Sequence, residues 1–379
     1  MKVLFFSVRN HHRNYFRKLS EQANHTGLYQ ATLVRHRHYW FKNLWPVFRT
    51  HPELDEVVRL KLKEKIQDTA DYRLAVFQLW LNKFWLSLSC RFLYRAYFNG
   101  LRQQSPDVVV SWSGMMWHQR ILVLAARSQD IPTLLMENGP LPDTTTIDPR
   151  GVNFINSLPR QLQDYSLHQT PPGQLPDALI PRQTNKRKSA AAQQQQPLPA
   201  RYVFVPFQVD ADRQILCFSP WIANMRDFYK ILESSVGSLP ADISLVIKEH
   251  PSCPKNFSDL HLHHPRIHFA NEQNTQHLIE QAELVVTINS SVGLEALLFD
   301  KPVAVLGQAF YNLEGLCLSA QNQQQLEKIF LRPEEWQASA YGKSYLSYLY
   351  NHYLVKGSWK QATKDHLHAM NQKIVELCR

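Results

Sequence analysis

Short apolar runs that alternate with helix-like stretches constrain the fold of this chain more than any other feature. The runs are mostly β-branched and apolar throughout, which is typical of parallel strands buried on both faces. We predict strands at residues 3–6, 107–112, 133–137, 201–207, 244–250, 283–289 and 301–307. Helix-like stretches lie between them at 13–23, 53–68, 118–129, 221–236 and 276–282. This alternation predicts an α/β fold with doubly wound parallel sheets.

A break in composition divides the pattern into two parts. Residues 181–200, PRQTNKRKSAAAQQQQPLPA, are polar, basic and rich in Gln, which is typical of a linker or an exposed loop. A chain of 379 residues also favours two domains. We therefore predict an N-terminal domain over 1–180, a C-terminal domain over 201–340 and a helical tail over 341–379. Ligands of such domains bind beyond the carboxyl ends of the strands.

The net charge and the cysteines narrow the class of protein. A formal charge of +10 favours anionic partners, which include nucleic acid, anionic lipid headgroups and substrates that carry phosphate. The five cysteines are scattered without a CxxC pair, so they favour a reducing cytoplasm over a zinc site or a disulfide framework. No apolar run is long enough for a signal peptide or a membrane span. Residues 76–98 come closest, and their interruption by Lys83, Arg91 and Arg95 predicts an amphipathic helix that packs on its own domain or touches a membrane surface.

The segment 287–311, TINSSVGLEALLFDKPVAVLGQAFY, reads as a strand, a polar turn and a helix that begins near Val292. The serines and glycine at this helix start leave backbone N–H groups and hydroxyls for an anion. Glu295, within the first helical turns, is placed to reach a ribose hydroxyl. The alternative is a plain capping turn, since Ser is common at helix N-caps.

In the segment 246–254, VIKEHPSCP, a strand leads directly into Lys248 and His250. Pro251 biases His250 towards an extended conformation at the strand end. A histidine there can contact a leaving phosphate, although a lone histidine is more often structural.

In the segment 204–215, FVPFQVDADRQI, Gln208, Asp210 and Asp212 follow a strand at alternating positions. Carboxylates beyond a strand end can supply the nucleophile of retaining sugar chemistry. A divalent-ion site or a solvated polar loop are the alternatives, and no further clustered oxygen ligands support the ion.

The segment 134–153, LLMENGPLPDTTTIDPRGVN, places Glu137 at the end of an apolar strand, before a loop rich in Gly, Pro and Thr. A half-buried carboxyl group at this position can serve as a general acid or base. A turn that carries an incidental acid is the alternative.

Together these four segments resemble the bacterial capsule polysaccharide biosynthesis proteins, which are retaining β-Kdo glycosyltransferases (Kdo is 3-deoxy-D-manno-oct-2-ulosonic acid). The similar region covers roughly residues 105–312, and the QxDxD pattern with the TINSSVGLEAL run is its most specific part. The resemblance implies a GT-B fold, with two Rossmann-like domains that face across a cleft. It also implies CMP-β-Kdo as donor, no metal ion or other cofactor, and a lipid-linked or polysaccharide acceptor. The location implied is the cytoplasm, with a possible contact to the inner face of the cytoplasmic membrane.

The resemblance also assigns roles to residues. Glu137 would be the general acid/base, and the QxDxD motif would hold the nucleophile, with Asp212 favoured over Asp210. The predicted catalytic residues are therefore Glu137, Asp210, Asp212 and His250. The predicted donor-binding residues are Gln208, Lys248, His250, Asn289, Ser290, Ser291, Gly293 and Glu295. A nucleophile with a second acid/base group suits retention, and hydrogen-bond donors at the CMP phosphate would help it leave.

Two other classes of function stay open. An enzyme of the same architecture could use CMP-sialic acid or a UDP-sugar, or could be a nucleotide-sugar epimerase, which has no need of a nucleophilic carboxylate at the QxDxD position. A non-catalytic module that binds nucleic acid or membrane is the other, because residues 33–49 interleave aromatic and basic side chains. The transferase prediction includes no nucleic-acid partner. Its acceptor-side candidates are His11, His12, Arg13, Trp112, Trp117 and His118.

Overall fold

The structure is a computed structural model that describes residues 1–39, 51–68, 76–165, 175–180 and 197–379. The described chain forms two compact units. Unit 1 comprises 1–139, 143–157 and 353–379, and unit 2 comprises 140–142 and 158–352. Most of the predicted linker, 181–196, lies outside the described residues.

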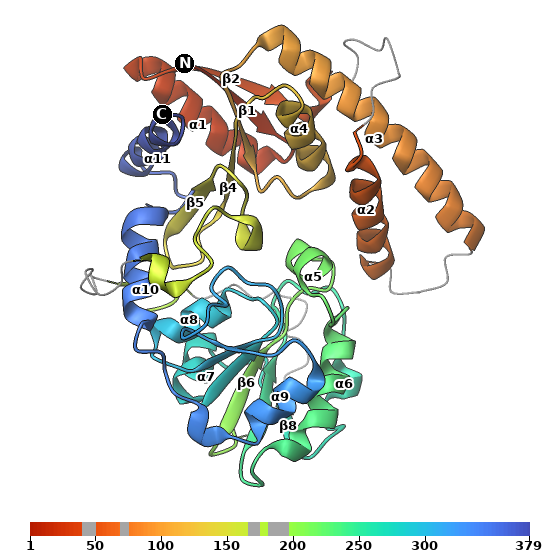
Figure 1. Cartoon of the computed structure of the whole chain (residues 1–379), viewed down its shortest axis with the longest axis vertical. Helices are drawn as coiled ribbons and strands as arrows, with labels where there is room; N and C mark the ends of the chain where they lie inside the picture. Colours follow the sequence, from red (N-terminus) through yellow and green to blue (C-terminus); the bar gives the residue numbers. More distant parts are fainter. Residues whose placement is uncertain (40–50, 69–75, 166–174, 181–196) are drawn as a thin grey trace. The chain divides into compact units, whose positions relative to one another are not determined.

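Unit 1 is built on a six-stranded sheet of order β12-β5-β4-β3-β1-β2, in which β5 and β12 run antiparallel to their neighbours. Its strands are β1 (Lys2–Ser7), β2 (Gln30–Arg35), β3 (Val108–Trp112), β4 (Thr133–Asn138), β5 (Thr144–Asp148) and β12 (Val355–Lys356). Its helices are α1 (Asn10–Thr26), α2 (Leu54–Asp68), α3 (Val76–Gln104), α4 (Trp117–Arg127) and α11 (Lys364–Leu377) (Figure 1).

Alternate residues of β1 show how helices cover both faces of this sheet. Val3 and Phe5 are buried in one core with α1 and α11, for example against Phe16. Leu4 and Phe6 point to the opposite face and are buried with α2, α3 and α4, where Phe6 packs edge-on against Tyr97. A strand buried on both sides needs the uninterrupted apolar run that its sequence has.

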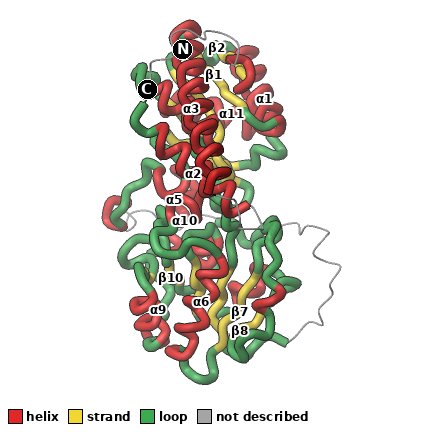
Figure 2. The backbone as a smooth tube through the Cα atoms, turned by 90° about the vertical axis from the view of Figure 1, so that its right-hand side faces the viewer, coloured by secondary structure: helices red, strands yellow, loops and turns green. Residues whose placement is uncertain are grey.

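Unit 2 is built on a fully parallel six-stranded sheet of order β11-β10-β9-β6-β7-β8. Its strands are β6 (Tyr202–Pro206), β7 (Ser244–Lys248), β8 (Ile267–Phe269), β9 (Leu284–Thr287), β10 (Val303–Val305) and β11 (Leu318–Ser319). Its helices are α5 (Arg213–Phe218), α6 (Met225–Ser235), α7 (Thr275–Gln281), α8 (Val292–Leu298), α9 (Gln323–Phe330) and α10 (Gly342–Tyr348) (Figure 2).

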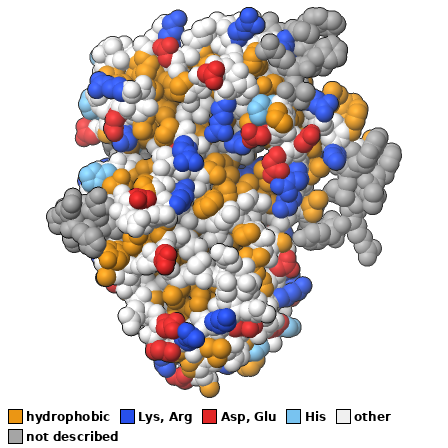
Figure 3. All heavy atoms as spheres, viewed as in Figure 1, with side chains coloured by type: hydrophobic (Ala, Val, Ile, Leu, Met, Phe, Trp, Pro, Cys, Tyr) orange, Lys and Arg blue, Asp and Glu red, His pale blue; other side chains and the backbone are white. Residues whose placement is uncertain are grey.

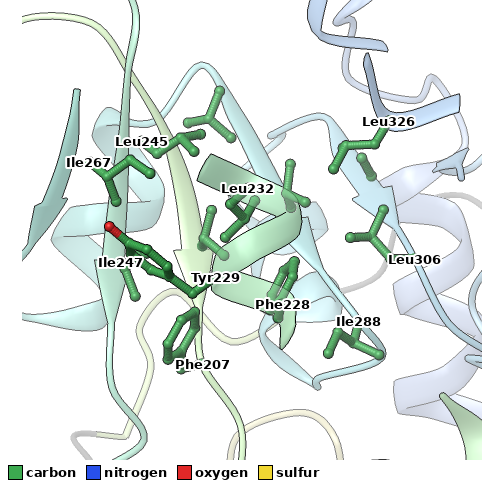
Figure 4. Packing of buried hydrophobic residues seen from close by; sticks show 14 of the residues in the cluster. Phe207, Phe228, Tyr229, Leu232, Leu245, Ile247, Ile267, Ile288, Leu306 and Leu326 are labelled. Atoms are coloured by element: carbon green, nitrogen blue, oxygen red, sulfur yellow. The ribbon is translucent and has the colours of Figure 1, made fainter. Parts of the chain in front are cut away.

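A hydrophobic core of unit 2 fills the space between the sheet, α6 and α9. Phe228 and Leu232 of α6 pack on Leu245 and Ile247 of β7, and Phe207 closes the cluster at the end of β6 (Figure 4). The rings of Phe207 and Phe228 lie 5.9 Å apart. Phe207 therefore anchors in the core the segment that carries the QxDxD motif.

Shorter helical turns complete the two units. Those of the 3-10 type are His36–Tyr39, Asn153–Ile155, Leu162–Tyr165, Val236–Ser238, Ser258–Leu260 and Pro333–Glu335, and Leu349–Tyr353 is a π-turn.

The predicted α/β class is confirmed: each of the two units is built on a six-stranded sheet, which is fully parallel in unit 2 and mainly parallel in unit 1. The GT-B type stays a prediction. The seven predicted strands, and the five helices predicted between them, are present within a few residues of their predicted bounds. The helix predicted over 76–98 extends to Gln104, and the tail predicted as helical contains β12 between α10 and α11. The strands that the sequence did not reveal lie mainly at sheet edges, and one of them, β5, occupies what was expected to be a loop after Glu137. That the two units face across a cleft stays a prediction.

The boundaries of the units differ from the predicted domains in three places. Residues 140–142 belong to unit 2, although they lie within the predicted N-terminal domain. Residues 158–165 belong to unit 2, although the N-terminal domain was predicted to extend to 180. The predicted helical tail is divided, because α10 stays with unit 2 while 353–379 forms part of unit 1. In the latter, β12 pairs with β5, and the Tyr15 hydroxyl of α1 lies 2.8 Å from His366 Nε2 of α11. A two-residue strand has no periodicity, so this return could not be predicted from the sequence pattern.

Candidate active site

A cavity of about 340 Å³ opens beyond the carboxyl ends of β6 and β7 in unit 2. Its lining joins several segments that are distant in sequence: Leu179 and Ile180, Phe204, Pro206 and Phe207, the stretch 248–251, the stretch 271–276, and Ser290, Val292 and Glu295. Ligands of parallel α/β sheets bind at this edge. Of the predicted donor-binding residues, Lys248, His250, Ser290 and Glu295 line the cavity.

A backbone hydrogen bond to one ring nitrogen of His250 determines which nitrogen carries the proton. The backbone N–H of Ser252 donates to His250 Nδ1 at 3.1 Å, so the proton of the neutral imidazole is on Nε2. An Nε2–H group is a hydrogen-bond donor, as the sequence-based role at a phosphate requires.

Lys248 lines the cavity and also holds the segment 271–273 in place by hydrogen bonds. Its ammonium donates to the backbone carbonyls of Asn271, at 2.9 Å, and Gln273. Burial lowers the pKa of Lys248, and the nearby Glu272 acts in the opposite direction. Glu249 adds a second tie, since the Asn271 side chain donates to its Oε1 at 2.9 Å. The lysine therefore fixes the wall formed by 271–273 as well as placing positive charge beside the cavity.

The turn between β9 and α8 forms another wall. The Ser290 hydroxyl accepts the Val292 N–H at 3.2 Å, while the Tyr311 hydroxyl donates to the Ser290 carbonyl. A Cβ atom on Gly293 would come within 2.5 Å of the Tyr311 hydroxyl. Gly293 thus gives Tyr311 room to support the turn, and it does not line the cavity. Ser291, also predicted to bind the donor, is the N-cap residue of α8 and is absent from the lining.

Gln208 and Asn289 form a buried brace between the ends of β6 and β9. Gln208 Nε2 donates to Asn289 Oδ1 at 2.9 Å, and the Asn289 N–H donates to Gln208 Oε1 at 3.2 Å. Asn289 Nδ2 also donates to the carbonyls of Gln214 and Phe218, at 2.9 and 3.1 Å. Both were predicted to bind the donor, but their side chains face each other and do not line the cavity.

The structure separates the two aspartates of the QxDxD motif. Asp210 is only 2% exposed, and both of its oxygens are engaged. Its Oδ2 forms an ion pair with Lys255 at 2.7 Å, and its Oδ1 accepts the N–H of Met225 at the start of α6, also at 2.7 Å. A carboxylate held in this way anchors a helix and a loop.

Asp212, by contrast, keeps contact with solvent. Its Oδ1 caps α5 by accepting the Gln214 N–H at 2.8 Å. Protein atoms nonetheless surround the carboxyl group closely enough that desolvation raises its pKa, against the opposing effects of the Gln214 N–H and Arg213. Through Gln214 and Asn289, hydrogen bonds connect Asp212 to the turn that carries Ser290.

In unit 1, Glu137 lies at the end of β4, as expected, and its Oε1 accepts several hydrogen bonds. The donors are the Asn138 backbone N–H at 2.9 Å, the Asn138 side-chain amide at 3.0 Å and Trp112 Nε1 at 3.2 Å. Asn138 is itself oriented by Trp359, whose Nε1 donates to Asn138 Oδ1 at 2.6 Å. These contacts hold the carboxylate at the carboxyl edge of the sheet.

Asn138 and Trp359 are residues that the sequence did not single out. Asn138 follows directly after Glu137, so its position beside a candidate acid was a usable signal. Trp359 is distant in sequence and had no such signal, because only the return of the chain into unit 1 brings it there.

The acceptor-side candidates divide into two groups. His12 stacks on Trp112 at 4.1 Å, and His11 lies 5.7 Å from Trp359, so these residues surround the Glu137 end of the sheet. His118 lies elsewhere in unit 1, 2.9 Å from the Tyr97 hydroxyl. Burial lowers the pKa of His12 to about 3, with His11 and Arg9 adding to the shift.

Within the described ranges, His, Cys, Asp and Glu side chains form no group of three or more placed to hold a metal ion. None of the helices in those ranges is both long and apolar enough to cross a membrane.

An α/β chain with a polar cavity at the strand ends of a parallel sheet belongs to the broad class that binds ligands beyond the carboxyl ends of the strands. Residues 178–359, just under half of the chain, match the family model described as capsule polysaccharide biosynthesis protein, and this part of the chain is similar to that family. The matched region contains the whole of the cavity lining.

Curated relatives extend the match. Protein FixF of Sinorhizobium fredii is 37% identical over 67% of this chain, which spans 61% of the relative. The capsule polysaccharide export protein KpsS of Escherichia coli is 33% identical over 31% of this chain and 33% of its own length. The chain therefore spans less than two thirds of each of these relatives.

Solved structures give weaker likenesses. A β-Kdo 2,7 transferase, KpsC of Thermosulfurimonas dismutans, is 16% identical with a TM-score of 0.43, over 75% of this chain and 89% of its own. A TM-score this low supports no inference about substrate or mechanism.

Proposed function

We propose that this protein is a retaining glycosyltransferase of bacterial surface polysaccharide synthesis, which transfers Kdo from CMP-β-Kdo to a lipid-linked or polysaccharide acceptor. The observation that carries the proposal is the cavity at the strand ends of unit 2, lined by Lys248, His250, Ser290 and Glu295. It lies within the region that matches the capsule polysaccharide biosynthesis family. The similarity to a capsule polysaccharide export protein supports a role in surface polysaccharide synthesis. The chemistry of the residues that line the cavity supports an anionic nucleotide donor.

The residues that line the cavity offer groups that suit the phosphate, the ribose and the base of a nucleoside monophosphate. His250 Nε2–H and the positive charge of Lys248 suit the phosphate, whose departure they would assist. Glu295, which is 8% exposed in α8, is an acceptor suited to ribose hydroxyls. The apolar side chains of Leu179, Ile180 and Phe204 suit the face of a base.

For the chemistry, Asp212 is the proposed nucleophile. Its carboxylate would form a bond to the anomeric carbon as the bond to the CMP phosphate breaks, with inversion. An acceptor hydroxyl would then attack the same carbon from the opposite side, with a second inversion that releases Asp212. The hydroxyl proton would pass to Glu137, the proposed general base. Asp210, which is saturated by Lys255 and Met225, is assigned to holding the motif in place.

The proposal uses no metal ion or other cofactor, since a phosphate leaving group can be stabilised by protein donors alone. It includes a cytoplasmic location, which five free cysteines favour. Nucleic acid is not among the proposed partners.

The test is CMP release from CMP-β-Kdo, with CMP-sialic acid and UDP-sugars as comparison donors. Asp212→Asn should lower CMP release by at least about a hundredfold, as loss of a nucleophile does. Glu334→Gln, a change at an exposed carboxylate of unit 2, is the matched control and should leave the rate unchanged.

Mass spectrometry of Glu137→Gln with donor should reveal a sugar adduct on the side chain of Asp212, assigned by fragmentation of the peptide that carries both aspartates. An adduct at Asp210 would reverse the assignment of the nucleophile. Release of UDP but not CMP would replace the donor, and release of neither would refute the transferase proposal.

A further inference from the structure

Helix α3 exposes a continuous apolar face that the fold of unit 1 does not use. Phe84 is 53% exposed, Trp85 60%, Leu88 46% and Phe92 38%. Residues 84, 88 and 92 recur at intervals of four, so they lie on one side of the helix, and Trp85 flanks them. We call these four residues the outer face of α3. The other large hydrophobic side chains exposed in the described ranges, Met1, Ile180, Leu262 and Leu331, are far apart in sequence.

The opposite side of the same helix already has its partners. Cys90, Leu93 and Tyr97 are at most 3% exposed and pack in the core shared with α2 and α4. Figure 1 shows the N-terminal half of α3 extending away from the sheet of unit 1, with α2 alongside. Large exposed aromatic groups clustered on one face mark an interaction surface more often than chance placement does.

The charged residues of α3 itself have one sign. The sequence of α3 contains no Asp or Glu, while Lys83 and Arg91 are exposed next to the apolar residues, and Arg95 follows one turn later. Lys63 and Lys65 of α2 are also exposed, on a helix that carries the acidic residues Asp55, Glu56 and Glu64 as well. In Figure 3, hydrophobic side chains on the visible surface of unit 1 lie among Lys and Arg side chains, and Asp and Glu side chains are present there too.

We propose that the outer face of α3 docks on an anionic lipid bilayer. Trp and Phe on an apolar face with Lys and Arg beside it are the composition of helices that lie in the membrane interface. Basic side chains near a bilayer that contains anionic lipid add electrostatic attraction, and Trp prefers the headgroup level. A second copy of the chain is a poorer occupant, because a symmetric contact would place the basic residues of two α3 helices against each other.

The proposal is tested by sedimentation with vesicles, and it needs no enzymatic turnover. The purified chain should bind vesicles of phosphatidylcholine with phosphatidylglycerol and leave those of phosphatidylcholine alone largely unbound. Trp85→Glu with Leu88→Glu should reduce partitioning at least tenfold. Leu262→Glu with Leu331→Glu, at leucines 82% and 63% exposed in unit 2, is the matched control and should retain binding.

A second pair of variants keeps the test open if the first pair does not fold. Lys83→Gln with Arg91→Gln removes only charge, and it should weaken binding to anionic vesicles in the same way as added salt does. Equal binding by wild type and both α3 pairs would overturn the proposal, as would failure of the wild type to bind any vesicle. A concentration-dependent dimer that the Trp85/Leu88 pair abolishes would assign the surface to a second copy instead.

Discussion

The contact between Trp359 and Asn138 makes a prediction that separates a positioning role from a merely structural one. Asn138→Ala removes the amide that donates to Glu137 Oε1 at 3.0 Å. Trp359→Phe keeps the aromatic ring but removes the Nε1–H that donates to Asn138 Oδ1 at 2.6 Å. If Asn138 transmits the effect of Trp359 to Glu137, the two substitutions are not independent.

The expected losses of activity follow from the strengths of the hydrogen bonds that each substitution removes. A hydrogen bond to a charged group contributes about 1.5–3 kcal/mol when buried, and Glu137 is partly exposed, so the lower end applies. Asn138→Ala should therefore lower kcat/KM for transfer by roughly tenfold. Trp359→Phe removes a neutral hydrogen bond of about 1 kcal/mol, which corresponds to roughly fivefold. The double variant should lose about as much as Asn138→Ala alone, and not the roughly fiftyfold product.

The assay is steady-state transfer from CMP-β-Kdo to acceptor, with kcat and the KM for donor measured separately. The loss should appear in kcat, since the donor cavity is built from unit 2. Lys360→Ala, beside Trp359, is the control and should leave kcat within twofold or so. Additive losses in the double variant would refute the coupling, whereas an inactive wild type would count against the proposed function and not against this contact.

Other expected outcomes concern single positions. The pKa of buried His12, lowered to about 3, lies below its unfolded value of 6.5, so its contribution to stability is present above about pH 6.5 and is lost as the pH falls towards 3. Between about pH 7 and about pH 5 the free energy of unfolding should therefore fall by roughly 2 kcal/mol through His12. In urea unfolding, His12→Phe should lose correspondingly less stability over the same range, and a pH dependence equal to that of the wild type would contradict this account. Gly293→Ala should force Tyr311 from the Ser290 turn, with a loss of about 1–3 kcal/mol in unfolding free energy and a raised KM for donor; wild-type values for both would show that the turn adapts. Asp148 accepts hydrogen bonds from the loop after β5 and, at 2.9 Å, from the Tyr353 hydroxyl, so Asp148→Ala should cost about 3 kcal/mol or more in thermal unfolding; a change within 0.5 kcal/mol or so would rule out this anchoring role.

The sequence by itself determined the class of fold and the edges at which the chemistry was sought. Apolar β-branched runs such as those of β1 and β6 are typical of a parallel strand covered on both faces, because the side chains on both of its faces are apolar and are stable only when buried. The polar residues that end such runs must then gather at the carboxyl edge of a sheet. For that reason Glu137, Lys248 and His250 were placed correctly at strand ends before any contact was known.

Only the tertiary structure decided what these residues do for one another. Asp210 and Asp212 are alike in sequence, yet one is neutralised by Lys255 and the other caps α5 in contact with solvent. Gly293 is present because of the Tyr311 ring, and Trp359 reaches Asn138 because the last segment returns to unit 1. Such pairings join residues far apart in the chain, and local pattern reports burial and periodicity but not partners.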